Sequence, residues 1–123
     1  MEPMDKIYYK KLIRDNIPEK IRAKGSECET RELSLEEFKH ALRVKIGEEA
    51  SELTNAATKD DFLTELADIF IVLSEIQTIE GVSDEELEAA IEENYQKKGG
   101  FEKRLFLEWS SNDGYTSEKV TKK

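Results

Sequence analysis

Acidic side chains interrupt two apolar ridges of the sequence. In residues 42–53 apolar side chains recur every three or four positions, as on one face of a helix, but Glu49 takes one of these positions and Glu52 follows one turn later. In residues 62–76 Glu65 breaks the same kind of ridge, and Asp68 is the one polar residue between positions 66 and 73. If the two helices face each other, four carboxylates meet on apolar surfaces, where unpaired charges are costly to bury.

The type and spacing of these carboxylates predict a site for a divalent cation. Mg²⁺ prefers oxygen ligands and keeps several of its waters, so it suits four carboxylates, and Mn²⁺ is an expected substitute. Lys45 is the nearest basic residue that could neutralise the acids instead. The alternative is that the acids lie on a solvated helix surface, as most clusters of charged residues do.

The composition limits the classes of protein to which the chain can belong. Its 123 residues suit one domain, but only 37% are hydrophobic, which predicts a small core and therefore self-association. Residues 6–24 carry seven basic and two acidic side chains, whereas residues 48–93 carry fifteen acidic and one basic. The acidic middle of the chain would repel phosphates, so we expect no binding to a nucleic acid polymer.

Several other classes of site are excluded because the residues or segments that they need occur once in the sequence or not at all. His40 and Cys28 are the single histidine and the single cysteine, which excludes an internal disulfide and zinc sites of several cysteines and argues against a conventional catalytic triad. No apolar run reaches the roughly 18 residues of a membrane span, and the N-terminal residues lack the apolar core of a signal peptide. We therefore expect a cytoplasmic protein that does not enter a membrane.

Capping and helix-breaking residues divide the chain into four predicted helices. A short helix covers residues 18–24, and a first long helix, which opens with a capping box of Ser34 and Glu37, covers residues 35–57. A second long helix has cap candidates at residues 58–61, continues through residues 62–76 and stops near Gly81. A last helix follows a second box at residues 83–86 and stops at the glycines 99 and 100. Because the link between the long helices is short, they should pack antiparallel. The predicted fold is an all-α antiparallel bundle of three to four helices in a single domain over residues 1–109, with a polar tail over residues 110–123.

Three motifs resemble those of a known superfamily. The acids form E-E-x-x-E and, after twelve residues, E-x-x-D, which resembles the signature of the all-α nucleotide pyrophosphohydrolases: MazG-type house-cleaning enzymes, dimeric dUTPases and phosphoribosyl-ATP pyrophosphohydrolases. Residues 9–18, Y-K-K-L-I-R-D-N-I-P, resemble the Y-N-K-L-V-R-D-K-I-P opening of a small single-domain MazG-like group. Residues 99–104, G-G-F-E-K-R, resemble the G-G-F-x-K-R ending of the same group. The resemblance spans roughly residues 9–107, nearly the whole chain.

The resemblance implies a MazG-like bundle with a Mg²⁺ site and assigns roles to the acids. By position, the implied metal ligands are Glu49, Glu52, Glu65 and Asp68. The candidate catalytic residues are Glu48, Glu49 and Glu52. Either Glu48 or Glu52 would take the proton of the attacking water, and a solvent-facing position without a role is an equal alternative for Glu48.

Basic residues of the two flanking motifs are candidates for binding substrate phosphates. Lys11 and Arg14 belong to the segment with most of the positive charge; the alternative for both is plain surface charge or ion pairs with the acidic helices. In the C-terminal motif basic side chains adjoin the amides of the glycines and the end of a helix. These candidates are Lys97, Lys98, Lys103 and Arg104. The chain departs from the motifs at Lys10 and Asn16, where Asn and Lys are usual, and at Lys98, where Arg often precedes the glycines.

The predicted function is Mg²⁺-dependent hydrolysis of a non-canonical nucleoside triphosphate to a nucleoside monophosphate and pyrophosphate, as in nucleotide-pool house-cleaning. One alternative keeps the fold and acts on phosphoribosyl-ATP in histidine biosynthesis; the motif at residues 9–18 favours the first. The other alternative is a non-catalytic helical interaction module, against which the complete set of ligand positions argues. Apolar residues cover more than one face of the 62–76 helix, which predicts a homodimer or a dimer of dimers centred on residues 66–73, and the resemblance implies the same.

Overall fold

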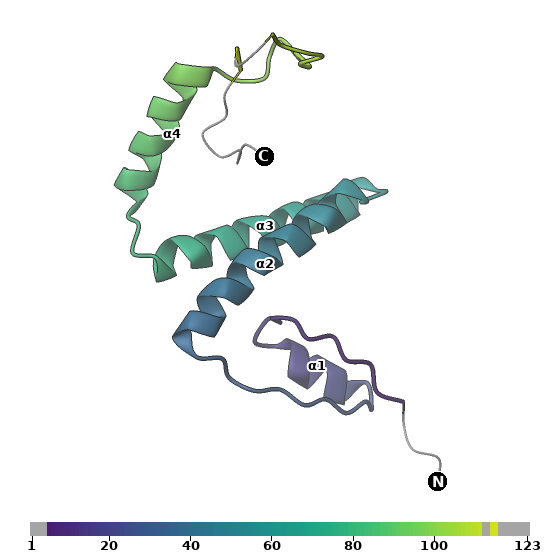
Figure 1. Ribbon diagram of the computed structural model, residues 1–123. Coiled ribbons are helices and arrows are strands. Elements are labelled where there is room, and N and C mark those ends of the chain that lie inside the picture. Colours follow the sequence, from purple (N-terminus) through teal and green to yellow (C-terminus); the bar gives the residue numbers. More distant parts are fainter. Residues whose placement is uncertain (1–4, 112–113, 116–123) are drawn as a thin grey trace. The chain divides into compact units, whose positions relative to one another are not determined.

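The described part of the chain is entirely helical in its regular structure. The computed structural model describes residues 5–111 and 114–115, and over these residues it contains four helices and no strand (Figure 1). The helices are α1, Ile17–Ala23, α2, Leu35–Thr54, α3, Lys59–Ile79, and α4, Asp84–Lys98. The predicted all-α fold is confirmed. None of the described helices is both long enough and apolar enough to cross a membrane.

The start of α2 is set by the predicted capping box. The Ser34 hydroxyl accepts a hydrogen bond from the Glu37 amide at 3.2 Å, and the Ser34 amide donates to the Glu37 carboxylate at 3.0 Å. Arg31 donates to the same carboxylate at 2.9 Å. The Arg31 hydrogen bond, followed by the bond from the Ser34 backbone, lowers the pKa of Glu37 to about 2. The Glu37 carboxylate therefore stays charged, and the cap stays complete, at acidic pH values where an ordinary glutamate is protonated.

The link between α2 and α3 begins earlier than predicted, whereas its end agrees with the cap candidates at residues 58–61. Helix α2 ends at Thr54, before the predicted end at residue 57, and the side chains of Thr54 and Asn55 donate to the carbonyls of Ala50 and Ser51. Short polar side chains of this kind compete for the carbonyls that would continue a helix. Helix α3 begins at Lys59 because the preceding residue, Thr58, caps it: the Thr58 hydroxyl accepts a hydrogen bond from the Asp61 amide at 3.0 Å.

Helices α2 and α3 pack side by side as an antiparallel hairpin (Figure 1). The buried apolar side chains of the described residues are Leu42 on α2 and Val72 on α3. Near the open end of the hairpin, Arg43 and Glu80 form an ion pair at 3.2 Å. The predicted antiparallel arrangement follows from these pairings, and it places the acidic residues of both helices beside each other.

The chain divides into two compact units, Met1–Ser83 and Asp84–Lys123. In the second unit α4 ends where Gly99 adopts a left-handed backbone, with a φ of 77° that a glycine adopts without strain. The next residue, Gly100, lies against the Tyr95 ring: a Cβ there would come within 3.1 Å of the Tyr95 hydroxyl oxygen. The Tyr95 hydroxyl donates a hydrogen bond to Glu102 at 3.2 Å, which joins the glycine motif to the last turns of α4.

Two predictions about domain organisation stay predictions. The single domain over residues 1–109 spans both units, which are described here separately. Most of the predicted polar tail over residues 110–123 lies outside the described residues.

Candidate active site

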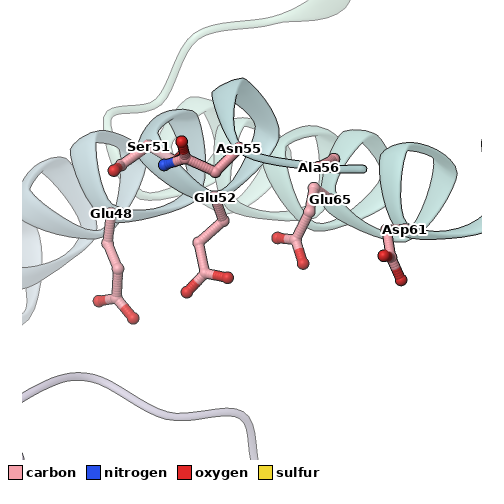
Figure 2. A pocket seen from close by; sticks show the side chains of 7 residues that line it. All are labelled: Glu48, Ser51, Glu52, Asn55, Ala56, Asp61 and Glu65. Carbon is pink, nitrogen blue, oxygen red and sulfur yellow. The ribbon is translucent and has the colours of Figure 1, made fainter. Parts of the chain in front are cut away.

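A shallow depression of about 610 Å³ runs along the α2–α3 hairpin and is lined mainly by acidic residues. Figure 2 shows four carboxylates pointing to the same side of the hairpin, from Glu48 and Glu52 on α2 and from Asp61 and Glu65 on α3. Ser51, Asn55 and Ala56 complete the lining. Asp61 was not among the predicted site residues. Its signal is in the sequence, since Asp61 and Glu65 are four residues apart and therefore share one helix face.

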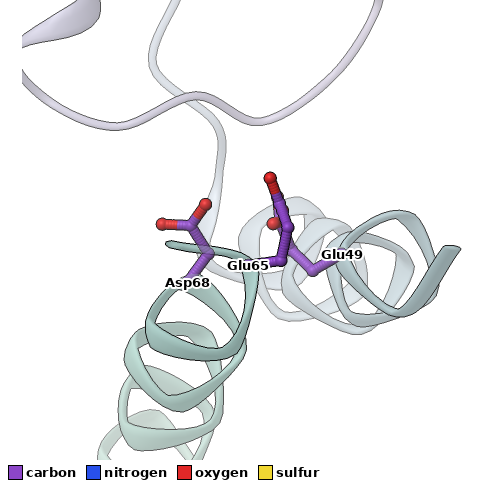
Figure 3. A group of neighbouring side chains, drawn as sticks. All are labelled: Glu49, Glu65 and Asp68. Carbon is purple, nitrogen blue, oxygen red and sulfur yellow. The ribbon is translucent and has the colours of Figure 1, made fainter. Parts of the chain in front are cut away.

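Beside this depression, three of the four predicted metal ligands meet. Glu49 on α2 and Glu65 and Asp68 on α3 each offer a carboxylate oxygen, and these oxygens all lie within 4.8 Å of one another (Figure 3). Glu49 is only 7% exposed, and the other two are half-buried. The fourth predicted ligand, Glu52, is exposed on the adjoining wall of the depression, outside this group of three.

The surroundings of Glu49 make its negative charge costly. Burial raises the pKa of Glu49, and a hydrogen bond with Glu65 and the charge of Asp68 raise it further; the Lys45 ammonium acts in the opposite direction. Three carboxylates this close repel one another when all are ionised. Their arrangement therefore favours a bound positive charge.

The three carboxylates fit a hard divalent cation such as Mg²⁺. Their donor atoms are all oxygens, the type that Mg²⁺ prefers, and two oxygens bound at about 2.1 Å to one ion lie at most about 4.2 Å apart. The oxygens all lie within 4.8 Å of one another, so small side-chain rotations would bring them within this limit. The remaining coordination positions of an octahedral ion would be filled by water, substrate or Glu52.

The basic N-terminal segment lies against the same acids. The Lys11 ammonium donates to Glu48 Oε1 at 2.9 Å, and Arg14 Nη1 lies 3.6 Å from Asp68 Oδ1. The Lys11 hydrogen bond lowers the pKa of Glu48 and, in return, raises the pKa of Lys11. Ion pairing with the acidic helices was the alternative to a phosphate-binding role for Lys11 and Arg14, and the structure shows it. These pairs also bring both cations to the rim of the site.

The backbone at Lys10 explains why asparagine is usual at this position of the motif at residues 9–18. Its φ of 51° lies in the left-handed region, which asparagine tolerates better than lysine does. The asparagine usual at this position of the motif suits that backbone. Lys10 lies between Tyr9 and Lys11, and the Lys11 ammonium lies 5.9 Å from the centre of the Tyr9 ring.

The other four predicted phosphate-binding residues belong to the second unit of the chain. Lys97 forms an ion pair with Glu93 at 3.1 Å on the surface of α4. The backbone of Arg104 is left-handed, with a φ of 53°. Lys97, Lys98, Lys103 and Arg104 are all exposed, and their part in the site stays a prediction.

A comparison with models of protein families shows to which family the chain belongs. The model described as phosphoribosyl-ATP pyrophosphohydrolase matches residues 9–95, well over half of the chain. The chain belongs to the phosphoribosyl-ATP pyrophosphohydrolase family. The match covers the N-terminal motif and every carboxylate of the acidic site, and it confirms the resemblance that the acidic signature indicated. The family model thus assigns the chain to a family of pyrophosphohydrolases, enzymes that hydrolyse a phosphoanhydride bond.

One relative is similar over part of its length. An uncharacterised protein of Mycolicibacterium smegmatis (strain ATCC 700084 / mc(2)155) is 49% identical over 49 residues, which cover 40% of this chain and 50% of that protein. The chain therefore spans about half the length of this curated relative. No solved structure matches the chain.

Proposed function

We propose that the protein is a Mg²⁺-dependent hydrolase that splits a non-canonical nucleoside triphosphate into a nucleoside monophosphate and pyrophosphate. The observation that carries this proposal is the group of three carboxylates from two helices, within 4.8 Å of one another and inside the region that the pyrophosphohydrolase model matches. A free nucleotide is the substrate, so we place the enzyme in the cytoplasm.

The carboxylates divide between holding the metal and activating water. Glu49, Glu65 and Asp68 would hold the cation, with Glu52 as a further ligand or as the general base. When bound, the cation neutralises charge on the phosphoryl oxygens and the leaving pyrophosphate and makes water more acidic. Glu48 shares one oxygen with two ammonium groups, and its lowered pKa makes it a weak base. Glu52, which lines the same depression, is the better candidate to accept the proton.

The basic residues supply the opposite charge that a polyphosphate needs. Lys11 and Arg14 lie at the rim of the acidic site, where their ammonium and guanidinium groups would neutralise phosphate oxygens next to the cation. In the second unit, the proposed phosphate-binding residues are Lys97, Lys98, Lys103 and Arg104. Positive charge of this kind would let an acidic chain bind a polyanion.

The substrate is tested by one screen. Purified protein with Mg²⁺ is incubated with ordinary, deoxy and damaged nucleoside triphosphates and with phosphoribosyl-ATP, and pyrophosphate release is measured. We expect release from a non-canonical triphosphate. The second candidate substrate is phosphoribosyl-ATP, which the description of the matching family model favours. Activity on phosphoribosyl-ATP alone would select it, and a folded protein without activity on any nucleotide would support a non-catalytic interaction module.

Metal binding should also be visible without any substrate. We expect millimolar Mg²⁺ or Mn²⁺ to raise the melting temperature, because binding to the native state relieves the repulsion among Glu49, Glu65 and Asp68. At a concentration of one hundred times Kd the added stability is about 2.7 kcal/mol. Differential scanning fluorimetry with EDTA, Mg²⁺ and Mn²⁺ measures the shift. A melting temperature that is the same in all three would contradict the proposed site.

The outer face of α3 supports self-association as part of this proposal. Large apolar side chains along α3 are exposed, namely Phe62, Leu63, Phe70, Ile71 and Leu73, whereas Leu66 is half-buried. A surface of this kind on a helix is typical of a protein–protein interface. We therefore propose a homodimer, or a dimer of dimers, with the segment around Phe70 at a twofold interface.

A further inference from the structure

Lys45 is a nearly buried lysine beside the carboxylates, considered so far only as a group that could neutralise their charge. Its side chain is 12% exposed, although lysine is rarely buried unless its charge is paired. The ammonium lies 3.3 Å from Glu48 Oε1 and 3.6 Å from Glu49 Oε1. One positive group therefore contacts two consecutive carboxylates of the site.

Because of the helix geometry, the double contact of Lys45 restricts two carboxylates that point in different directions. Consecutive side chains of an α-helix leave its axis about 100° apart, so Glu48 and Glu49 point to different sides of α2. Glu48 lines the depression, whereas Glu49 meets Glu65 and Asp68. A group that contacts both carboxylates must lie between them, and it restricts the rotation of each.

The contact is not an ordinary pair on a helix surface. Exposed lysine–glutamate pairs contribute little, and a lysine placed four residues before the glutamate is in the weaker of the two orders. Here the side chains of Lys45 and Glu49 are only 12% and 9% exposed. Charges in such surroundings are screened less by water, so the position of the ammonium acts more strongly on its neighbours.

The contact also connects the two halves of the site. Glu48 Oε1, which accepts from Lys45, accepts from Lys11 of the N-terminal segment as well, at 2.9 Å. Two ammonium groups thus share one carboxylate oxygen. Through Glu48, the residue that holds Glu49 also fixes a candidate phosphate-binding lysine.

We propose that Lys45 is a positioning residue of this site: its ammonium holds Glu49 toward Glu65 and Asp68 and holds Glu48 toward Lys11. The proposal rests on the proposed metal-dependent function. Groups that fix the ligands of a metal ion, without touching the ion, typically change its affinity 10–100-fold when they are replaced.

The test compares the Mg²⁺ and Mn²⁺ affinities of variants by calorimetry, without nucleotide. Lys45→Met keeps the length of the apolar stem and removes the ammonium; Lys45→Arg keeps the charge. We expect Lys45→Met to weaken metal binding about tenfold and Lys45→Arg to restore part of the loss. The matched control is Lys39→Met, the same change on α2 away from the acidic cluster, which should leave metal affinity unchanged.

The sign of the effect separates positioning from plain electrostatics. Removal of a positive charge beside a cation site by itself strengthens cation binding, so tighter or unchanged binding by Lys45→Met would overturn the proposal. Circular dichroism checks folding, and if Lys45→Met does not fold, Lys45→Gln takes its place with the same expected weakening. If neither variant folds, the role of Lys45 is in folding alone, which also overturns the proposal.

The proposed function can fail separately. Weaker metal binding by Lys45→Met together with an inactive wild-type protein would support positioning and contradict nucleotide hydrolysis. Unchanged metal binding by Lys45→Met together with an active wild-type protein would contradict positioning by Lys45 and support nucleotide hydrolysis.

Discussion

Replacing Glu49 by glutamine, or Asp68 by asparagine, is expected to abolish nucleotide hydrolysis while leaving the helical content intact. Each amide keeps the size of the side chain but removes the negative charge that a divalent cation requires. Changes in residues that merely hydrogen-bond to metal ligands already cost 10–100-fold, so the loss here should reach at least about 100-fold. Pyrophosphate release and circular dichroism measure the two effects.

The same variants should separate metal binding from folding. Glu49 is buried, and its charge is costly beside Glu65 and Asp68, so Glu49→Gln should not lower the melting temperature measured in EDTA. It should, however, remove the stabilisation by Mg²⁺. Two exposed acids provide controls: Glu75→Gln on α3 and Glu88→Gln on α4 should be nearly silent. Equal losses from all four changes would indicate general electrostatics instead of a defined site.

Replacing Phe70 by glutamate is expected to dissociate the proposed oligomer and to lower its activity, although Phe70 is no metal ligand. Phe70 is 64% exposed in the single chain. A twofold interface contains this side chain twice, and burying its exposed part contributes about 1–2 kcal/mol each time. The two losses together should raise the dissociation constant at least about 30-fold, since 1.4 kcal/mol corresponds to a factor of ten.

Light scattering and sedimentation at micromolar concentration measure this change. Phe70→Leu is the matched control, because it keeps an apolar side chain at the same place, and it should preserve the oligomer. A wild-type protein that is monomeric and fully active at this concentration would contradict the proposed homodimer or dimer of dimers.

Most of the secondary structure was predictable because its signals are local. The capping box of Ser34 and Glu37 marked the start of α2 to the residue, since both hydrogen bonds join groups three positions apart. The end of α2 was predicted too late. Thr54 and Asn55 turn their side chains back onto helix carbonyls, and the apolar spacing around residue 57 does not reveal this competition.

For the site, the sequence by itself determined which carboxylates interrupt the apolar ridges, because the helix period sets the face on which each side chain lies. It thereby predicted an acidic site between two antiparallel helices. It did not determine which of those carboxylates meet. The structure brings Glu49, Glu65 and Asp68 together and leaves Glu52 on the adjoining wall.

Only the tertiary structure decided these contacts, together with the place of Arg14 beside Asp68. The physical reason is that each depends on how far α2 and α3 rotate about their axes as they pack, and on the path of a segment more than thirty residues away. Rotation of a helix by a fraction of a turn exchanges one neighbouring carboxylate for the next, whereas the spacing along the chain stays the same.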